Sequence, residues 1–265
     1  MSADGRGALW LPPWDGPSYA ANTAHHRRYD AEFLAGIDLP PTARILDVGC
    51  GSGDFTVKLA DLVPHGHVVG LDPQPSMIEQ ARAAARPNQS FVPGTAQGLD
   101  RLAGPFDAVV SRAVLHWVPL ADHPAVLAAA AGLLRHGGLL RLEAGGGDNV
   151  ASVVAMLDEI SARHGGPISP WTFPQAGEYL DVVLAAGFTV DDGWVRLAAQ
   201  RRPFTRDELT GWLSSQCLQA YEHTMPPDER AGFRAEALAG VDRLCRADGS
   251  YDVTWVRLDV RAHRR

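Results

Sequence analysis

A hydrophobic run that stops abruptly in a glycine cluster is the feature that most constrains this sequence. The stretch "ILDVGCGSGDFT", Ile45 to Thr56, begins with the short apolar, β-branched character of a buried parallel strand. The turn that follows has glycine at positions 49, 51 and 53. Glycine admits a positive φ there and lets a ligand approach the backbone more closely than any Cβ would allow. We therefore expect the first strand of an open α/β sheet, with a ligand at its carboxyl end.

Strands and helices alternate along most of the chain. At this spacing the alternation predicts a doubly wound, mostly parallel sheet, because right-handed crossovers bury both faces of the sheet under helices. The pattern loosens beyond Gly147, where two helical segments precede the last two strands. The expected strands are "RILDVG", "HVVGLD", "QSFVPG", "FDAVVSR", "LLRLEAGG", "TVDDGWVRLAAQ" and "YDVTWVRLDVRAHRR".

We interpret residues 1–265 as a single domain. Residues 1–38 are expected to form an N-terminal arm and a first helix, which runs from about Ser18 to Ile37. The ligand-binding core spans 40–200, and a terminal strand at 250–265 completes it. The polar and aromatic helical segment 205–247 interrupts the sheet between its last two strands. An insertion of that size near a sheet edge is a candidate lid over the substrate.

Composition narrows the possible partners. The chain carries 24 Lys and Arg against 31 Asp and Glu, for a net charge of −7, which disfavours nucleic acid and favours a small-molecule or peptide substrate. Cys50, Cys217 and Cys245 form no zinc-ligand cluster, so we expect reduced thiols and no metal. Without a signal-peptide pattern or a membrane-length apolar run, we expect a cytoplasmic protein without membrane contact. Nothing indicates its oligomeric state.

The acids around the glycine turn discriminate between ligands. A dinucleotide fingerprint GxGxxG needs its third glycine at position 54, where Asp54 would face a pyrophosphate, and no GxxxxGK phosphate loop is present. Asp47 adds negative charge, which suits a ligand with a positive charge. Asp72 ends the second strand, about 20 residues beyond the turn, where a carboxylate can hold both ribose hydroxyls. Alternatively, Asp72 is an ordinary helix-capping residue. Together these acids indicate a cationic ribonucleoside.

These residues resemble the class I S-adenosylmethionine-dependent methyltransferases, whose first motif is an acid followed by GxGxG, here "DVGCGSG". The resemblance covers residues 40–145 and includes "GLDPQPSMIEQAR" and "FDAVVSRAVLHWV". The segments "ALW", "PSYAANTAHHRR" and "LLRHGGLLRLEAGGGDNVA" are similar to the trans-aconitate methyltransferase-like group of small-molecule enzymes. The resemblance implies a Rossmann-like seven-stranded sheet, S-adenosylmethionine as cofactor and S-adenosylhomocysteine as product.

The resemblance also implies the cofactor contacts. Asp47 positions the turn and the methionyl ammonium, and Asp72 holds the ribose. Thr95 replaces the family's usual acid at the adenine edge, so that the hydrogen bond to the exocyclic amine is weaker or is supplied by Gln97. Ser111 and Arg112 offer backbone carbonyls to the ammonium. The remaining implied contacts line the methionine, ribose and adenine or close over the cofactor: Tyr19, Arg28, Gly49, Cys50, Gly51, Gly53, Pro73, Met77, Ala96, His116 and Trp117.

The acceptor decides whether a base is needed. Methyl transfer from a sulfonium is an in-line displacement that depends mainly on alignment, and a carboxylate acceptor needs no base. A hydroxyl, carbon or nitrogen acceptor is helped by one, for which His116 is the first candidate and His25 the second. Alternatively, His116 and Trp117 only wall the pocket. Trp171, Trp212 and Tyr221 are further candidate walls, or core residues.

We expect an oxygen acceptor, carboxylate or hydroxyl, on a metabolite or natural-product intermediate. The alternatives are carbon or nitrogen methylation of a natural product, an NAD-dependent oxidoreductase, which Asp54 disfavours, and a cofactor-binding module without catalysis.

Overall fold

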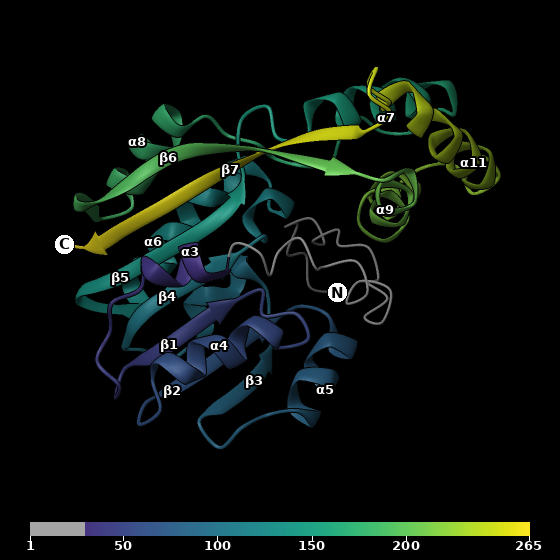
Figure 1. Ribbon diagram of the computed structural model, residues 1–265. Helices are drawn as coiled ribbons and strands as arrows, with labels where there is room; N and C mark the ends of the chain where they lie inside the picture. The colour runs from purple at the N-terminus through teal and green to yellow at the C-terminus, as the bar shows by residue number, and fades with distance from the viewer. Residues whose placement is uncertain (1–29) are drawn as a thin grey trace, which may run out of the picture.

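The computed structural model describes residues 30–265 of the protein, which form a seven-stranded sheet in the order β3-β2-β1-β4-β5-β7-β6 (Figure 1). Neighbours from β3 to β5 pair in parallel, whereas β7 pairs antiparallel with both β5 and β6. This topology confirms the predicted doubly wound, mostly parallel sheet. The strands are β1 Arg44–Val48, β2 His67–Asp72, β3 Gln89–Pro93, β4 Phe106–Arg112, β5 Leu134–Gly145, β6 Phe188–Phe204 and β7 Tyr251–Arg264.

Helices cover both faces of the sheet. On β1, Ile45 faces the apolar cluster of α3 and α4, whereas Leu46 and Val48 face that of α6 and α8. Both faces of β1 are therefore buried, which explains its almost continuous apolar sequence. The helices concerned are α3 Asp30–Ala35, α4 Asp54–Leu62 and α5 Pro75–Ala83 on one face, and α6 His123–Leu133 and α8 Ala176–Ala185 on the other.

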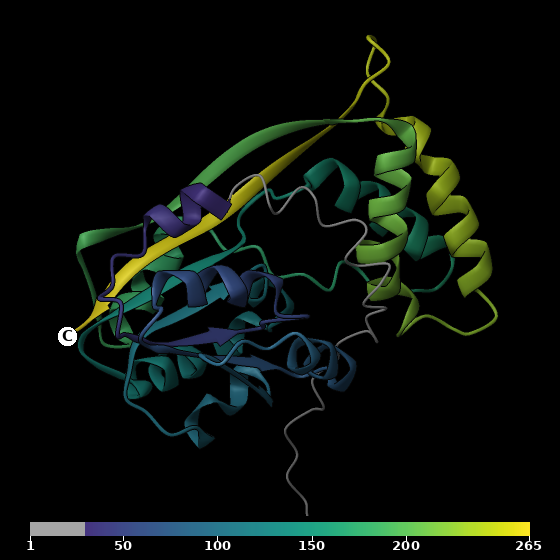
Figure 2. The same cartoon turned by 60° about the horizontal axis from the view of Figure 1, so that its bottom comes forward.

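A second apolar core lies outside the sheet, in a helical unit that we call the cap (Figure 2). Its centre contains the fully buried side chains of Tyr221 and Phe233, which share one apolar cluster with Leu157 of the helix at 151–163. The expected insertion at 205–247 is therefore only part of this unit, because the segment before residue 200 supplies a helix as well. The cap consists of α7 Ala151–Arg163, α9 Arg206–Trp212, the π-helical turn η4 Leu213–Cys217, α10 Leu218–Glu222, α11 Arg230–Gly240 and η5 Val241–Leu244.

The long strands β6 and β7 form a ribbon that joins the sheet to the cap. They pair from Phe188 and Arg264 at one end to Phe204 and Tyr251 at the other. The ends Phe204 and Tyr251 are buried in the apolar core of the cap. The ribbon therefore fixes the position of the cap relative to the carboxyl ends of the parallel strands.

Two expected boundaries differ from the structure or fall outside it. The strand expected to begin at Leu139 begins at Leu134 instead, directly after α6, because Leu134 already pairs with Phe106 before a register shift. Of the predicted first helix, only the end is described, as α3, and the part before residue 30 lies outside the described residues.

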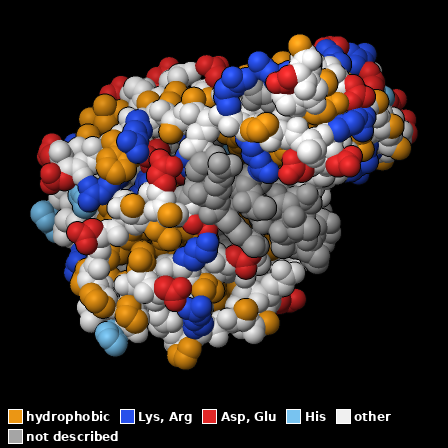
Figure 3. Space-filling model, in the orientation of Figure 1, with side chains coloured by type: hydrophobic (Ala, Val, Ile, Leu, Met, Phe, Trp, Pro, Cys, Tyr) orange, Lys and Arg blue, Asp and Glu red, His pale blue; other side chains and the backbone are white. Residues whose placement is uncertain are grey.

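On the face drawn in Figure 3, acidic and basic side chains of the cap alternate. Charged side chains of the cap form ion pairs with one another, such as Arg163 with Glu236 at 2.5 Å and Arg234 with Glu222 at 2.6 Å. Within residues 30–265, no helix has the length and apolar character needed to cross a membrane. The same residues contain no group of three or more His, Cys, Asp or Glu side chains arranged for a metal ion.

Candidate active site

The glycine turn after β1 has the backbone conformation predicted for it. Gly49, Gly51 and Gly53 have φ values of 77°, 53° and 86°. A Cβ on Gly49 would lie 2.1 Å from Cγ2 of Val114, whereas a Cβ on Gly51 would meet nothing within 4 Å. Glycine is thus needed at position 49 for the packing of the turn, while Gly51 leaves open space beside the backbone.

Asp72 connects the end of β2 to this turn. The Gly51 N–H donates to its Oδ2 at 3.0 Å, and the Gln74 N–H donates to its Oδ1 at 2.9 Å. Burial raises the pKa of Asp72, and these two hydrogen bonds oppose that rise. Each carboxylate oxygen has a second acceptor direction. Acceptance of these two backbone N–H groups and the expected ribose role are therefore compatible, whereas the cap position of α5 is occupied by Gln74.

Asp47 is buried below the turn, away from the cavity. Its side chain is 2% exposed and accepts a hydrogen bond of 2.6 Å from Thr56 Oγ1 in α4. Burial raises the pKa of Asp47 to about 6, against the opposing hydrogen bond from Thr56. This contact ties β1 to α4 and so positions the turn, whereas the cavity wall is formed by other residues.

Asp47→Asn is expected to stabilise the protein at neutral pH. Because the folded state raises the pKa, ionisation of Asp47 above pH 6 costs stability, and this cost vanishes as pH falls through 6 towards 3.8. A shift of about two units corresponds to about 3 kcal/mol of the free energy of unfolding. Urea unfolding of both proteins at pH 8 and at pH 4.5 measures the difference. A gain that is equal at both pH values contradicts this assignment.

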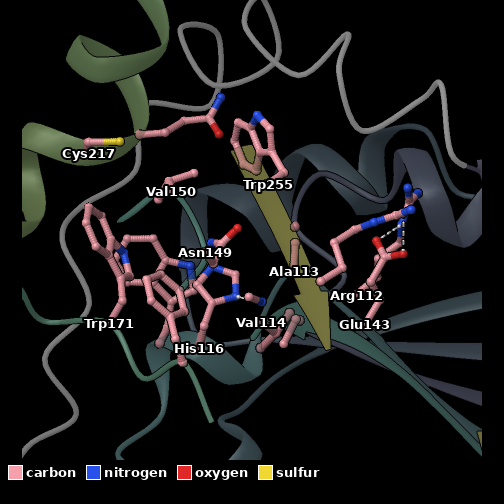
Figure 4. Close-up of a pocket in the computed structure, with 18 of the residues that line it drawn as sticks. Arg112, Ala113, Val114, His116, Glu143, Asn149, Val150, Trp171, Cys217 and Trp255 are labelled. Atoms are coloured by element: carbon pink, nitrogen blue, oxygen red, sulfur yellow. Dashed lines mark hydrogen bonds and ion pairs between the residues drawn. The ribbon is translucent and has the colours of Figure 1, made fainter. Parts of the chain in front are cut away.

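The carboxyl ends of β1, β2, β4 and β5 open into a cavity that extends to the cap (Figure 4). Two non-glycine residues of this wall have a positive φ, Ala113 at 59° and Val150 at 45°. Backbone strain of this kind is concentrated at functional sites. The wall consists of Gly49, Gly51, Asp72–Gln74, Met77, Arg112–Val114, His116, Trp117, Glu143–Gly145, Asn149, Val150, Trp171, Phe173, Gln200, Arg202, Trp212, Gln216, Cys217, Trp255 and Arg257.

His116 lies in a short 3₁₀ turn, η2 Leu115–Trp117, directly after β4. The Gly145 N–H donates to its Nδ1 at 3.2 Å, and burial lowers the pKa of His116 to about 4. With Nδ1 as an acceptor, the neutral ring carries its proton on Nε2. His116 is therefore arranged as a hydrogen-bond donor within the wall. The base role expected for it needs an unprotonated ring nitrogen that can accept a proton, and Nδ1, the unprotonated one, already accepts the Gly145 N–H.

The charged wall residues beside β4 and β5 neutralise one another. Glu143 accepts hydrogen bonds from Arg112 Nε at 3.2 Å and from Arg257 Nη1 at 2.7 Å. Arg112 also pairs with Asp30, and Arg257 lies 3.5 Å from Glu32. The side chain of Arg112 is thus part of an ion-pair network, whereas the resemblance implies a role only for its backbone carbonyl.

Aromatic rings form much of the remaining wall. Trp171 stacks on Phe173 with ring centroids 6.2 Å apart, and Trp117 meets Trp171 edge-on at 5.7 Å. On the side of the cap, Trp212 meets Trp255 edge-on at 4.9 Å. Two of the three candidate aromatic walls, Trp171 and Trp212, line the cavity.

Tyr221, the third candidate, is a core residue. It is fully buried in the cap, and its hydroxyl donates to Asp158 Oδ1 at 2.6 Å.

Comparisons with known proteins bear on this site. Residues 45–138 match a family described as a methyltransferase domain. A trans-aconitate 2-methyltransferase of Methylobacterium radiotolerans is 30% identical over 256 residues, which cover 91% of each chain. The chain belongs to the class I S-adenosylmethionine-dependent methyltransferases. A further relative of this methyltransferase, a trans-aconitate 2-methyltransferase of Streptomyces coelicolor, is 36% identical over 199 residues, 68% of this chain and 63% of that one.

Solved structures show the same fold. The YcgJ protein of Bacillus subtilis has a TM-score of 0.61 at 17% identity, over 91% of this methyltransferase and 99% of that chain. The cyclopropane synthase MmaA2 of Mycobacterium tuberculosis has a TM-score of 0.57 at 17% identity, over 89% and 83%.

Several predicted cofactor contacts lie outside the cavity wall of the methyltransferase. Ser111 Oγ donates to the Val48 carbonyl at 2.9 Å, and Cys50 packs into an apolar cluster with α5. Gln97 Nε2 donates to Asp122 Oδ2 at 3.2 Å, while its buried Oε1 has no hydrogen-bond partner within residues 30–265. The predicted contacts outside the wall are Asp47, Cys50, Gly53, Thr95, Ala96, Gln97 and Ser111.

Sequence reasoning missed the wall residues of the β6–β7 ribbon and of the segment before α7. Gln200 and Arg202 are two apart on β6, as are Trp255 and Arg257 on β7, so the period of two in these strands was an available signal. Asn149, whose Oδ1 accepts the Val256 N–H at 2.9 Å, had no such signal. Tyr19, His25 and Arg28 lie outside the described residues.

Proposed function

We propose that this methyltransferase transfers the methyl group of S-adenosylmethionine to a carboxylate oxygen of a small-molecule acceptor. The observation that carries the proposal is the state of the titratable side chains along the cavity wall. A hydroxyl, amine or carbon acceptor loses a proton during transfer and gains from a positioned base, whereas a carboxylate arrives ionised.

No titratable wall side chain that the structure describes is arranged as a base. Asp72 accepts two backbone N–H groups, and Glu143 accepts from two guanidinium groups. Nδ1 of His116 accepts the Gly145 N–H. Burial raises the pKa of the Cys217 thiol well above its usual range, so it stays protonated. A carboxylate is the oxygen acceptor that such a wall serves best.

The residues at the carboxyl ends of β1, β2 and β3 fit the cofactor. We assign Gly49 and Gly51 to the methionine and ribose, and Asp72 to the ribose hydroxyls. The unpartnered carbonyl oxygen of Gln97 suits the exocyclic amine of adenine, which compensates for Thr95. When bound, S-adenosylmethionine supplies a methyl group on a sulfonium, an electrophile that needs no further activation.

Alignment and exclusion of water are then the contributions of the protein. Orienting an acceptor against a reactive group is worth roughly 7 to 11 kcal/mol in well-aligned reactions. The stacked rings of Trp171 and Phe173, with Trp117, exclude water from a transfer in which opposite charges neutralise. We assign the Nε2–H of His116 to orient the acceptor carboxylate, and the cap to act as a lid.

The relatives support an acid as the acceptor. Several are named trans-aconitate 2-methyltransferases, and trans-aconitate is a carboxylic acid.

Two variants of His116 test the absence of a base. In His116→Asn, the amide oxygen can replace Nδ1 as acceptor of the Gly145 N–H, and we expect kcat within about tenfold of the parent, since one hydrogen bond to the acceptor is lost. His116→Phe leaves that buried N–H unpaired and should lower the free energy of unfolding by about 1 to 3 kcal/mol. Steady-state kinetics and urea unfolding provide both values. A fall of about 100-fold or more in kcat for His116→Asn indicates a base instead.

A further inference from the structure

We propose that the acceptor is a flat, apolar acid whose second anionic group pairs with Arg202 at the cap end of the cavity. This proposal rests on the proposed function for the identity of the reacting end. In this arrangement the cavity has a distal subsite for one carboxylate and, between aromatic rings, a second subsite for the apolar body of the acid.

One face of the β6–β7 ribbon supplies the distal part of the wall. Gln200 lies opposite Trp255 and Arg202 opposite Val253 in the antiparallel register, and residues two apart on a strand share a face. Gln200, Arg202, Trp255 and Arg257 all line the cavity, which shows that this face is directed into it.

Among the wall residues that the structure describes, Arg202 is the cation that forms no ion pair with a carboxylate. Its buried Nη1 has no hydrogen-bond partner among residues 30–265, and its guanidinium lies 4.3 Å from the ring centroid of Phe204. Glu208 attracts Arg202 electrostatically, but the Glu208 carboxylate accepts the capping-box hydrogen bonds of Thr205. A buried cationic nitrogen without a partner is costly, and an anionic ligand group offsets that cost.

The other two cations that the described residues contribute to the wall are already paired. Arg112 and Arg257 share Glu143, and each also meets a carboxylate of α3, Asp30 or Glu32. Within the described part of the cavity, the wall therefore provides for one additional anion.

The register of the ribbon sets the distance between the two ends of the acceptor. Gly145, whose N–H holds His116, lies opposite Arg257, which lies opposite Ala198, and Arg202 is four residues farther along β6. Four residues of strand span roughly 13 Å. Since the Arg202 side chain can reach back along the cavity, the two acidic groups of the acceptor are separated by on the order of 10 Å.

Aromatic rings occupy the wall between these ends. Trp171 and Phe173 line one side, and the edge-on pair Trp212 and Trp255 lines the side towards the cap, where Figure 4 shows Trp255 across the cavity from Trp171. Rings in this arrangement favour a flat apolar body. A compact tricarboxylate would leave this region unfilled and would place carboxylates against apolar rings.

Isothermal titration in the presence of saturating S-adenosylhomocysteine tests the subsite without methyl transfer. The ligands are biphenyl-4,4′-dicarboxylate, biphenyl-4-carboxylate, which lacks the distal anion, and trans-aconitate. We expect the parent protein to bind the diacid at least tenfold more tightly than the monoacid, and trans-aconitate more weakly than the diacid. Arg202→Gln should remove the preference for the diacid and leave the affinity for the monoacid unchanged, which also reports that the variant is folded.

Arg201→Gln is the matched control, because the neighbouring residue on a strand faces the opposite side of the ribbon. We expect it to keep the parent's affinities. Equal binding of the two biphenyl acids by the parent, binding of none of the three ligands, or tighter binding of trans-aconitate overturns the proposal; so does a diacid preference that survives Arg202→Gln. Arg202→Lys, which keeps the charge, should recover part of the preference. This binding measurement does not depend on which atom is methylated, so its outcome is independent of whether the proposed function is correct.

Discussion

Asp72→Ala is expected to weaken the binding of S-adenosylhomocysteine by about 100- to 10,000-fold, because hydrogen bonds to a charged group contribute about 1.5 to 3 kcal/mol each and two ribose hydroxyls are involved. The substitution also removes the acceptors of the Gly51 and Gln74 N–H groups, which hold the glycine turn beside the end of β2. Isothermal titration of the parent and the variant measures the change.

Asp54→Ala is the matched control for Asp72→Ala. Asp54 is an exposed carboxylate in the first turn of α4, close to the same glycine turn, and makes no expected cofactor contact. We expect its affinity for S-adenosylhomocysteine to stay within about threefold of the parent, as is usual for surface changes of up to 0.5 kcal/mol. Affinity that is retained in Asp72→Ala contradicts the ribose assignment.

Gly49→Ala is expected to lower the free energy of unfolding by about 3 kcal/mol and to abolish cofactor binding. Two costs add: a positive φ of 77° disfavours alanine by about 1 to 2 kcal/mol, and the new methyl group overlaps Val114 Cγ2 at 2.1 Å, where overpacking costs about 1 to 3 kcal/mol. Urea unfolding and titration with S-adenosylhomocysteine measure the two effects.

Gly51→Ala separates these costs. Gly51 also has a positive φ, 53°, but a Cβ there meets nothing within 4 Å, so only the conformational cost of about 1 kcal/mol is expected. Adding Val114→Ala to Gly49→Ala should recover part of the lost stability, because it removes the overlapping methyl groups. Equal losses for Gly49→Ala and Gly51→Ala, with no recovery in the double variant, mean that packing against Val114 is unimportant.

The part of the fold around β1 was predictable because its signals are local. The apolar run from Ile45 to Val48 and the glycines after it determine a strand, a turn with positive φ and a helix without reference to distant residues. The extent of the cap was not predictable in this way. Helix α7 joins the cap through packing of residues such as Leu157 against Phe233, and sequence periodicity does not say which core an amphipathic helix enters.

The residues of the candidate site likewise divide into those that the sequence predicts and those that depend on tertiary structure. Asp72 was predicted from its distance to the glycine turn and Met77 from the family resemblance, and both lie on the cavity wall. Arg202 and Trp255 meet the cavity only because the β6–β7 register brings them there, and register depends on tertiary pairing. The hydrogen bond that leaves His116 a donor comes from Gly145, on a neighbouring strand.

Base-labile release of the transferred methyl group tests the central claim most directly. The protein is incubated with S-adenosylmethionine radiolabelled in its methyl group and with biphenyl-4,4′-dicarboxylate, biphenyl-4-carboxylate or trans-aconitate, and the product is then treated with mild alkali. A carboxylate methyl ester hydrolyses to volatile methanol, so we expect the transferred label in the vapour phase. Label that stays with the product after alkali, as in a methyl ether, a methylamine or a methylated carbon, contradicts transfer to a carboxylate.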